Sequence, residues 1–383
     1  MSGLETVTSS VEDVLIDSLQ FKPAPGASYL TAKRQTRWHA SGSDTYSSTT
    51  GVKVLRFALT GAAQEWCDPQ SVRLQFDVNN TDDTNALKPL TGPWGLIQRV
   101  SVRVLGTLVE DITLYGRCYE QFFLGLTKEA RQRELDLGFV GQVDENGAVT
   151  MEAIAQSTAK TVTMNLLCGL FSGQTKYLWL SAMGPITLEI ELANKDACLD
   201  TSSSGSSSFT ITNAMVLGSV VDVAPDLLNA YTKHLEEGRS LPYHFGTFSN
   251  VEHSIANAAN FSINQSRSFS RLSTILCSFM VAETTTVRDV TNFAGKTAGD
   301  TITAAEDNLE SYIALGPNRY PVYPTQKLCS HHMFYLDALG KLNSDAHHPG
   351  VTMKKYRKNA LILGWNLETV SYTHLTLPTI CSV

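Results

Sequence analysis

The sequence predicts an all-β protein built from two β-sandwiches or barrels in tandem. Short runs of alternating apolar and polar residues recur along most of the chain, and clusters of Gly, Pro, Asn and Asp separate them. Helical patterns are few and do not alternate with strands, so a parallel α/β sheet is not expected. The 383 residues are enough for two domains of ordinary size, and 43% hydrophobic with 17% charged residues indicates a packed protein.

A hairpin followed by a helix forms the clearest local pattern, within residues 87–123. The run from Val100 to Val104 alternates apolar with polar side chains, which is typical of a half-buried strand. Leu105-Gly106 predicts a tight turn because glycine tolerates positive φ, and residues 107–112 are expected to run back as the second strand. Aromatic and apolar residues then recur at helical spacing, at Tyr115, Tyr119, Phe122, Phe123 and Leu126.

A second helix is expected from Pro225 to Gly238. Proline suits the first turn, Asp226 favours the positive end of the helix dipole, and Gly238 suits the position after the last turn. The apolar side chains of this helix form one stripe, made by Leu227, Leu228, Tyr231 and Leu235. A Pro-aromatic segment at 241–245 follows directly and predicts a further strand.

The remaining alternating runs predict strands in both halves of the chain. In the first half they cover 34–46, 52–59, 72–78, 160–171, 176–180, 186–192 and 209–223. In the second half they cover 243–255, 260–269, 272–281, 312–315 and 360–367, with an amphipathic helix at 325–339. Polar segments at 136–159 and 201–208 are expected to be loops. The helices near 115 and 325 are separated by roughly 210 residues, which fits two fused sandwiches.

The two helical segments and the order of features along most of the chain resemble the double jelly-roll major capsid proteins of virophages, polinton-like viruses and nucleocytoplasmic large DNA viruses. In that family a polar-proline lead-in, a Gly-turn hairpin and an aromatic helix stand where 87–123 stands, and a linker before a Pro-aromatic strand stands where 225–245 stands. The resemblance implies two jelly rolls per chain and homotrimeric, pseudo-hexagonal capsomers in an icosahedral virion. It also implies penton and minor capsid partners and a double-stranded DNA genome.

The chain is expected to divide into an N-terminal arm (1–30), a first jelly roll (31–224), a linker helix (225–240), an incomplete second jelly roll (241–369) and a non-native tail (370–383). Residues 370–379 read VSYTHLTLPT, which looks like the translation of a transposase adapter used in sequencing libraries. On this interpretation no selection shaped the tail, so we expect it to be irregular and the second barrel to lack its last strands.

Composition narrows the class of protein further. The net charge of −7 without a long basic run argues against sequence-specific nucleic-acid binding. The acidic N-terminus lacks the apolar segment of a signal peptide, and no apolar run reaches the roughly 18 residues of a membrane span. Membrane contact is left open. The seven cysteines are scattered singly, which indicates reduced thiols.

Searching for chemistry leads to no catalytic residue, cofactor site or metal site. The sequence has no GxSxG, GxxxxGK[ST], GxGxxG or HExxH motif. The best metal candidate combines Cys329, His331 and His332 with His347 and His348. Adjacent histidines on a helix point about 100° apart, so few of these side chains converge. We therefore expect surface histidines rather than a metal site.

Other polar groups have structural interpretations. Trp38-His39 and Tyr243-His244 are expected to be packed or hydrogen-bonded pairs in strands. Glu110-Asp111 is expected to pair with Arg99 or Arg103 across the hairpin. The basic run 354–358 is expected to be a solvated strand edge.

Two other classes of function remain as alternatives to a capsid protein. A β-sandwich carbohydrate- or receptor-binding module would need aromatic residues with acidic partners on loops; Trp66 and Trp94 lie near turns but lack such partners. An enzyme on a cupin-like barrel would need a His-x-His and Glu set, which the sequence does not contain. A capsid protein, which is not an enzyme, is the favoured hypothesis.

Overall fold

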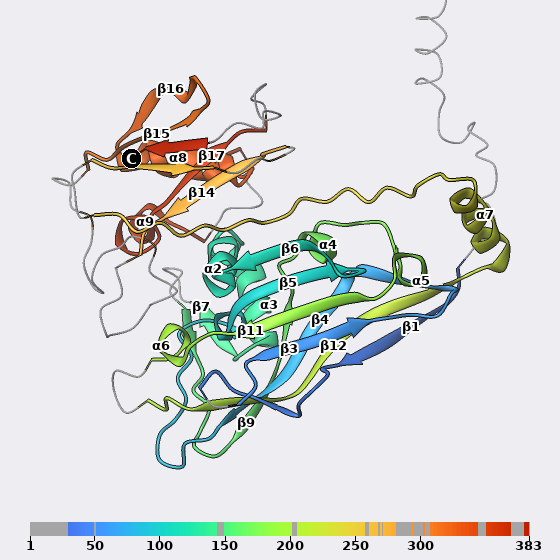
Figure 1. Ribbon diagram of the computed structural model, residues 1–383. Coiled ribbons are helices and arrows are strands. Elements are labelled where there is room, and N and C mark those ends of the chain that lie inside the picture. The colour runs from blue at the N-terminus through green and yellow to red at the C-terminus, as the bar shows by residue number, and fades with distance from the viewer. Residues whose placement is uncertain are drawn as a thin grey trace, which may run out of the picture.

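The structure is a computed structural model. It describes residues 30–49, 51–143, 149–200, 205–256, 260–266, 269, 271–280, 293, 302, 307–343, 350–368 and 379–382. Below, residues 30–223 are called the first half, and residues 260–382 the second half. Figure 1 shows both halves and the long segment that connects them.

The first half contains two antiparallel sheets. In one sheet, β1 (Leu30–His39) pairs with β12 (Phe209–Val223), which pairs with β4 (Glu65–Asn80). The far edge of β4 is covered by β9 (Ala159–Asn165) and β10 (Leu178–Trp179), which together act as one broken strand. A short strand, β2 (Thr45–Tyr46), adds to β12.

The second sheet of the first half follows the order β3 (Val54–Leu59), β11 (Ile186–Leu192), β5 (Ile97–Val104) and β6 (Thr107–Thr113). With β9 and β10 counted as one strand, and with β2 and the separate pair β7 and β8 left aside, the strands in chain order lie as 1-8-3-6 in one sheet and 2-7-4-5 in the other. This order is the double Greek key of a jelly roll. The prediction of a β-sandwich is therefore confirmed for the first half.

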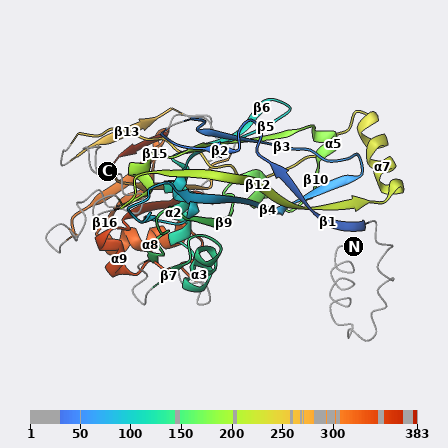
Figure 2. The ribbon, with the colours of Figure 1, turned by 90° about the horizontal axis from the view of Figure 1, so that it is seen from below.

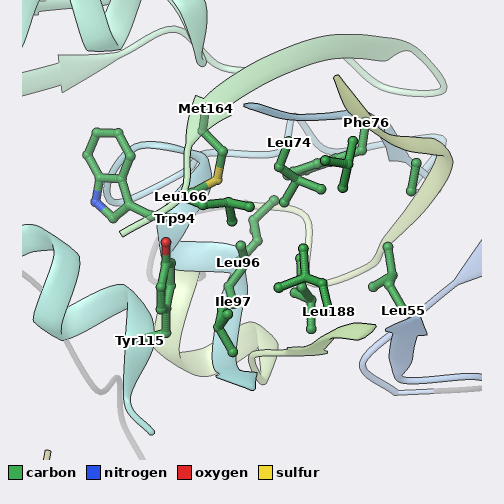
Figure 3. Packing of buried hydrophobic residues seen from close by; sticks show 14 of the residues in the cluster. Leu55, Leu74, Phe76, Trp94, Leu96, Ile97, Tyr115, Met164, Leu166 and Leu188 are labelled. Carbon is green, nitrogen blue, oxygen red and sulfur yellow. The ribbon is translucent and has the colours of Figure 1, made fainter. Parts of the chain in front are cut away.

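The core of the first half lies between these two sheets. Leu74 and Phe76 of β4 face Leu55 and Leu188 of the opposite sheet, and all four are almost fully buried (Figure 3). Burial patterns alternate along β3, β11 and the second part of β4, because successive side chains of a strand point to opposite faces. The apolar residues of the alternating runs seen in the sequence are therefore the ones that form the core between the sheets.

The predicted hairpin and helix are confirmed. Leu105 and Gly106 both have positive φ, 49° and 79°, as a two-residue hairpin turn requires. Leu114, also at positive φ (48°), turns the chain from β6 into α2 (Tyr115–Leu124). Before the hairpin, the short 3-10 helix η2 (Pro93–Leu96) leads into β5.

The region expected to be a loop at 136–159 contains regular structure. Helix α3 (Lys128–Leu137), capped by Thr127, is followed by the two-stranded sheet of β7 (Gly141–Val143) and β8 (Val149–Met151). The prediction of a loop was wrong there, because pairing between two short strands is not visible in their polar composition. Short helices α4 (Gly169–Ser172), α5 (Leu180–Met183) and α6 (Lys195–Cys198) complete the first half.

The second half repeats the second sheet of the first. Its order is β13 (Ser262–Gln265), β18 (Thr379–Ser382), β15 (Glu310–Leu315) and β16 (Asn318–Gln326), which corresponds strand by strand to β3, β11, β5 and β6. A second pair, β14 (Thr274–Ser278) with β17 (Ile362–Asn366), corresponds to β4 with β9. Among the described residues of the second half, no strand takes the places of β1 and β12.

The hairpin of the second half is also followed by a helix. Lys327 at φ 68° turns the chain from β16 into α8 (Leu328–Ala338), as Leu114 does before α2. The helix expected at 325–339 therefore begins later, because Thr325 and Gln326 pair with β15. Figure 1 shows α8 lying against β17. None of the described helices is long and apolar enough to cross a membrane.

The basic run 354–358 is not a strand edge as expected. It forms most of helix α9 (Met353–Lys358), which Thr352 caps by accepting a hydrogen bond from the amide of Lys355. Tyr356 is fully buried, so the helix packs one aromatic face while the lysines at 354 and 358 remain exposed. A single buried side chain in a short charged segment leaves no periodicity to identify the helix from sequence.

The linker helix is confirmed as α7 (Pro225–Glu236), and Gly238 has the positive φ (76°) expected after its last turn. The strand expected at 243–255 is wrong: residues 239–256 form no helix or strand. They run as an extended segment along the first half toward β14 (Figures 1 and 2). Side chains of the first half, rather than a strand ladder, bond this backbone.

We expected the whole tail, residues 370–383, to be irregular, and the structure contradicts this for its last described residues. Thr379–Ser382 form β18, which pairs with both β13 and β15, so an irregular course is wrong for these four residues. Strand pairing uses backbone groups, and the facing edges of β13 and β15 can accept an extended segment of almost any sequence. The adapter origin of the tail remains a prediction, as does the incomplete second barrel; residues 369–378 lie outside the described residues.

Candidate functional site

The connecting segment is fastened to the first half by a buried carboxylate. Glu110 of β6 is 3% exposed and accepts hydrogen bonds from the Cys168 thiol (2.8 Å), the Gly169 amide (2.8 Å) and the Phe248 amide (2.9 Å). These donors come from two separate parts of the chain, the start of α4 and the connecting segment. We call residues 241–250 the strap, because Glu110 holds them against the sandwich.

Further contacts hold both ends of the strap. At its start, the Tyr243 hydroxyl donates to the Tyr177 carbonyl (3.3 Å). Near its end, the Asn250 amide side chain donates to the Thr113 carbonyl (2.7 Å), at the last residue of β6. Between them, Phe248 packs edge-on against Phe122 of α2, with ring centroids 5.1 Å apart. The strap thus contacts the second part of the edge strand β6, at Glu110 and Thr113.

The sequence did not reveal the role of Glu110. We expected Glu110 and Asp111 to pair with arginine, and only Asp111 does so, through two 2.7 Å bonds with Arg99. Successive residues of a strand face opposite sides, so Asp111 lies on the outer face and Glu110 points inward. Burial raises the pKa of Glu110, and its hydrogen bonds oppose that shift. Burial and the nearby carboxylate likewise raise the pKa of the Cys168 thiol, which makes it unreactive.

Helix α2 joins the first half to the second. The guanidinium of Arg117 donates to the Phe279 carbonyl (2.7 Å) and lies over the Phe293 ring, 4.5 Å from its centroid. The Gln121 side chain donates to Ser278 Oγ (2.6 Å), at the end of β14. Buried charged and aromatic groups of this kind fix orientation as well as stability. The aromatic helix predicted from the sequence is therefore the joint between the halves.

The chain after α2 continues this joint. Leu124 packs in the hydrophobic core of the second half. The carbonyl of Gly125 accepts a hydrogen bond from the Lys341 ammonium, and the Leu126 carbonyl accepts one from the Gly350 amide at 3.1 Å. The two halves therefore share side chains and backbone bonds, and do not merely touch.

A second buried carboxylate braces α2 from inside. Glu120 accepts hydrogen bonds from the Thr91 hydroxyl (2.5 Å) and the Trp94 indole (2.8 Å), and burial raises its pKa. Trp94 is fully buried and stacks on Tyr119, with centroids 4.5 Å apart. This arrangement fixes the turn at η2 against the helix.

Glu120→Gln is expected to reduce the pH dependence of stability. A carboxyl whose pKa is higher in the folded than in the unfolded state binds more protons when folded, so its stabilising contribution is lost as pH rises above the ordinary value of 4.5. Glutamine cannot ionise and can still accept from Thr91 and Trp94. The loss of melting temperature between pH 5 and pH 8 should therefore be smaller in the variant than in the unaltered chain. An equal or larger loss in the variant would contradict this assignment.

The outer face of the second sheet carries a ladder of charges. Glu189 and Glu191 of β11 pair with Arg56 and Lys53, both at 2.9 Å. Asp111 pairs with Arg99 on the far side, as described above. These exposed pairs stabilise little individually, but together they keep this face polar. The face is therefore a poor candidate for a hydrophobic contact with another subunit.

The described metal candidates, Cys329, His331 and His332, do not form a site. His331 is 2% exposed, and its two ring nitrogens lie 2.9 Å from Ser311 Oγ and 2.7 Å from the Lys327 carbonyl oxygen. His332 bonds to the Val351 carbonyl (3.1 Å), and Cys329 is exposed. Within the described ranges, no group of three or more His, Cys, Asp or Glu residues is placed to hold a metal. His347 and His348 lie outside them.

The expectation of surface histidines is wrong for His331. The sequence could not show that it points from α8 toward β15, since only the packing of helix on sheet brings Ser311 within reach. Burial lowers the pKa of His331, which favours the neutral ring. A neutral imidazole can donate from one nitrogen and accept at the other, as these two partners require.

His331→Ala is expected to lower the free energy of unfolding by about 1–3 kcal/mol, because it leaves the buried Ser311 hydroxyl without its partner and removes the side-chain bond to the Lys327 carbonyl. His244→Ala is the matched control, since His244 is exposed and should cost under about 0.5 kcal/mol. Urea unfolding of both variants measures the difference. Equal stability of the two would show that the hydrogen bonds of His331 contribute nothing.

The other aromatic candidates are used for packing. Trp38 is buried and donates to the Thr60 carbonyl, whereas His39 is exposed, so the expected pair is only half correct. Trp66 stacks on Trp179, with centroids 5.2 Å apart, and Tyr231 of α7 lies against it. The ring of Trp66 is thus occupied by Trp179 and Tyr231, and Trp94 is fully buried. Neither tryptophan considered for sugar binding offers a free face.

Exposed apolar residues mark the remaining candidate surface. Val322 and Tyr323 of β16 are 77% and 86% exposed, and Leu105 at the tip of the first hairpin is 68% exposed. Isolated exposed apolar residues are ordinary, but two adjacent ones on the end strand of a sheet indicate a contact site. The described surface therefore has a candidate site for association at Val322 and Tyr323.

Comparison with solved structures identifies the fold. No protein-family model matches the sequence, and no curated protein is similar to it in sequence. VP54 of PBCV-1, in a structure fitted into a reconstruction of the virophage Sputnik, aligns with 94% of this chain and 86% of its own, with a TM-score of 0.59 and 13% identity. A chain from the structure of the Sputnik virophage aligns with 97% of this chain and 86% of its own, with a TM-score of 0.50 and 10% identity.

A chain of the PBCV-1 capsid gives a similar result, with a TM-score of 0.57 and 12% identity over 94% of this chain and 86% of its own. These alignments span both halves of the protein. The chain therefore has the double jelly-roll fold of viral major capsid proteins, as the resemblance in the sequence implied.

Proposed function

We propose that this chain is a viral major capsid protein whose homotrimers form pseudo-hexagonal capsomers of an icosahedral shell. The observation that carries the proposal is the repetition of the strand order β3-β11-β5-β6 as β13-β18-β15-β16, each ending in a hairpin, a residue at positive φ and a helix. Two equivalent sandwiches per chain give six per trimer. Six similar sandwiches around a three-fold axis give the trimer a nearly hexagonal outline. Copies of such a trimer can pack side by side into a closed shell with few kinds of contact between trimers.

The organisation of the halves supports the same function. Arg117, Gln121 and Leu124 of α2 tie the two halves together, as a rigid tile requires. The buried carboxylates Glu110 and Glu120 serve packing, and neither faces a partner suited to acid–base catalysis. We accordingly assign the protein to the virion capsid, without enzymatic activity, metal or cofactor. Its partners would be further copies of itself and, at the vertices, penton and minor capsid proteins.

The segment boundaries form part of this proposal. We propose an arm at 1–30, a first jelly roll at 31–224, a linker helix at 225–240 and a second jelly roll at 241–369; the positions of β12 and α7 support the boundary near 224. Two segments depart from these boundaries. The strap begins the second jelly roll in sequence but contacts the first half, and β18 lies beyond residue 369 but pairs with β13 and β15.

Light scattering coupled to size exclusion tests the proposal directly. We expect a particle of three times the mass of one chain, and negative-stain images with a three-fold, near-hexagonal outline. A stable monomer across the micromolar range would overturn the trimer. Glycan-array binding by such a monomer would instead favour the carbohydrate-binding alternative.

A further inference from the structure

The slot between β13 and β15 can be compared, position by position, with its counterpart in the first half. There β11 lies between β3 and β5, and its residues 186–191 are each paired on both sides. In the second half β18 lies between β13 and β15, with Thr379–Ser382 paired on both sides. Both strands start opposite the last residue before the hairpin turn, Val104 or Leu315. Counted from that residue, the slot has six positions, of which β18 occupies the first four.

The fifth and sixth positions of the slot lie between backbone edges that β18 does not reach. On one side they face Ser311 and Glu310, at the start of β15. On the other side they face Phe261 and Asn260, since β18 ends opposite Ser262. Among the described residues, none pairs with these four on the side of the slot. Free edges of this kind bind an added strand through its main chain.

The apolar pattern of an occupant follows from β11. Its residues at positions one, three and five are Ile186, Leu188 and Ile190, and each is at most 1% exposed. Positions one and three of the slot lie opposite Leu315 and Ile313, which both pack in the hydrophobic core of the second half. Directly opposite residues of neighbouring strands share a face of the sheet. A strand that fits the slot therefore has aliphatic residues at positions one, three and five.

The charge required at position six differs between the halves. In the first half this position is Glu191, which pairs with Lys53 (2.9 Å) and lies opposite Arg99. In the second half it lies between Glu310 and Asn260, both of which are exposed. Opposite charges on facing strands attract, and like charges repel. The slot therefore favours Lys or Arg at position six, where β11 has an acidic residue.

We propose that the slot between β13 and β15 is a binding site for an extended peptide of another polypeptide. The peptide has aliphatic residues at positions one, three and five and Lys or Arg at position six, and it runs antiparallel to β15. It displaces β18 and extends the pairing as far as Glu310. Main-chain bonds to two strands supply affinity, and the side-chain pattern supplies specificity. This inference goes beyond the proposed capsid function and does not require the trimer.

Competition with β18 tests the site. The peptide Ile-Thr-Leu-Thr-Val-Lys has the required pattern, and Thr-Ile-Thr-Leu-Lys-Val has the same composition with the alternation shifted by one position. Each labelled peptide is titrated, by fluorescence polarisation, against the full chain and against its Ile380→Pro variant, in which proline removes a backbone donor from β18. We expect the first peptide to bind the variant at least about tenfold more tightly than the unaltered chain. Equal affinity of the two peptides, or no binding by the first at millimolar concentration, would overturn the proposal.

A charge reversal tests position six while the sequence of β18 stays unchanged. A third peptide has Glu in place of the final Lys. The unaltered chain should bind the Lys peptide about two- to fivefold more tightly than the Glu peptide, as expected for an exposed ion pair, and Glu310→Lys should reverse this preference. Glu129→Lys is the matched control, since Glu129 is exposed on α3 of the first half and should leave the preference as it is. A preference that Glu310→Lys leaves unaltered contradicts the assigned register.

Hydrogen exchange locates the bound peptide. Binding of Ile-Thr-Leu-Thr-Val-Lys should slow exchange in residues 260–265 and 310–315 and leave the strap unaffected. Protection confined to any other segment would show that the peptide binds elsewhere, and the proposal would fail. That failure would leave the proposed capsid function standing, because trimer formation is measured without any peptide.

Discussion

Phe123→Ala is expected to lower the free energy of unfolding by about 3–5 kcal/mol. Phe123 is 1% exposed and lies 4.7 Å from Trp94, ring centroid to ring centroid, at the centre of the contact between α2 and η2. Truncation removes this contact and leaves a cavity that the surrounding sheets cannot close. A loss of this size is a large share of the roughly 5–15 kcal/mol that stabilise a domain. Urea unfolding measures the loss, and the yield of assembled particles should fall with it.

Leu105→Ala is the matched control, because Leu105 belongs to the same hairpin–helix segment and is largely exposed. It should change the free energy of unfolding by less than about 0.5 kcal/mol. Phe122→Ala should give an intermediate loss, since Phe122 is half-buried and contacts Phe248 of the strap. If Phe123→Ala unfolds like Leu105→Ala, α2 does not anchor the core as described.

Glu110→Ala should cost about 3 kcal/mol, because the buried Cys168 thiol and Gly169 amide and the partly buried Phe248 amide lose their shared acceptor, and each buried unsatisfied donor costs about 1–3 kcal/mol. The strap bonds to Glu110 through Phe248, so its backbone amides should exchange with solvent faster in the variant. Hydrogen-exchange mass spectrometry on residues 241–250 measures this effect separately from global stability.

Asp111→Ala is the control for Glu110→Ala. It removes the neighbouring carboxylate from the exposed ion pair with Arg99, and such pairs contribute about 0–1 kcal/mol. It should leave exchange in the strap unchanged. A larger loss for Asp111→Ala than for Glu110→Ala would show that the outer charge ladder, and not the buried carboxylate, holds this region.

Several elements could be predicted from the sequence because local chemistry decides them. The turn at Leu105-Gly106 needs positive φ, which glycine permits, and the structure has it there. The helix from Pro225 carries its own start and stop signals, and it ends as these predict. The alternation of apolar and polar residues along 186–192 predicted both the strand and the side of it that is buried. Such patterns led to the fold class and to the resemblance with double jelly-roll capsid proteins.

Other predictions failed where residues far away in sequence determine the structure of a segment. Residues 243–255 have the composition of a strand, but the strap is held by bonds that involve side chains, from the Phe248 amide to the Glu110 carboxylate and from the Asn250 side chain to the Thr113 carbonyl, and so forms no ladder. His331 looked like a surface residue until the packing of α8 on β15 buried it. The roles of Glu110 and Arg117 also depend on segments more than a hundred residues away in sequence. No local pattern encodes such distances.

The sequence by itself determined helix α2 and most of the strands and turns of the first half, because backbone preference and the period of apolar residues act within a few neighbours. Only the tertiary structure decided which edges are covered, which carboxylates are buried and where the two halves join. Those properties depend on the order in which strands meet across the sheets. That order brings Glu110 of β6 against the strap and leaves Tyr323 of β16 exposed. Burial and hydrogen bonding are set by neighbours in space, and the chain fixes these only when it has folded.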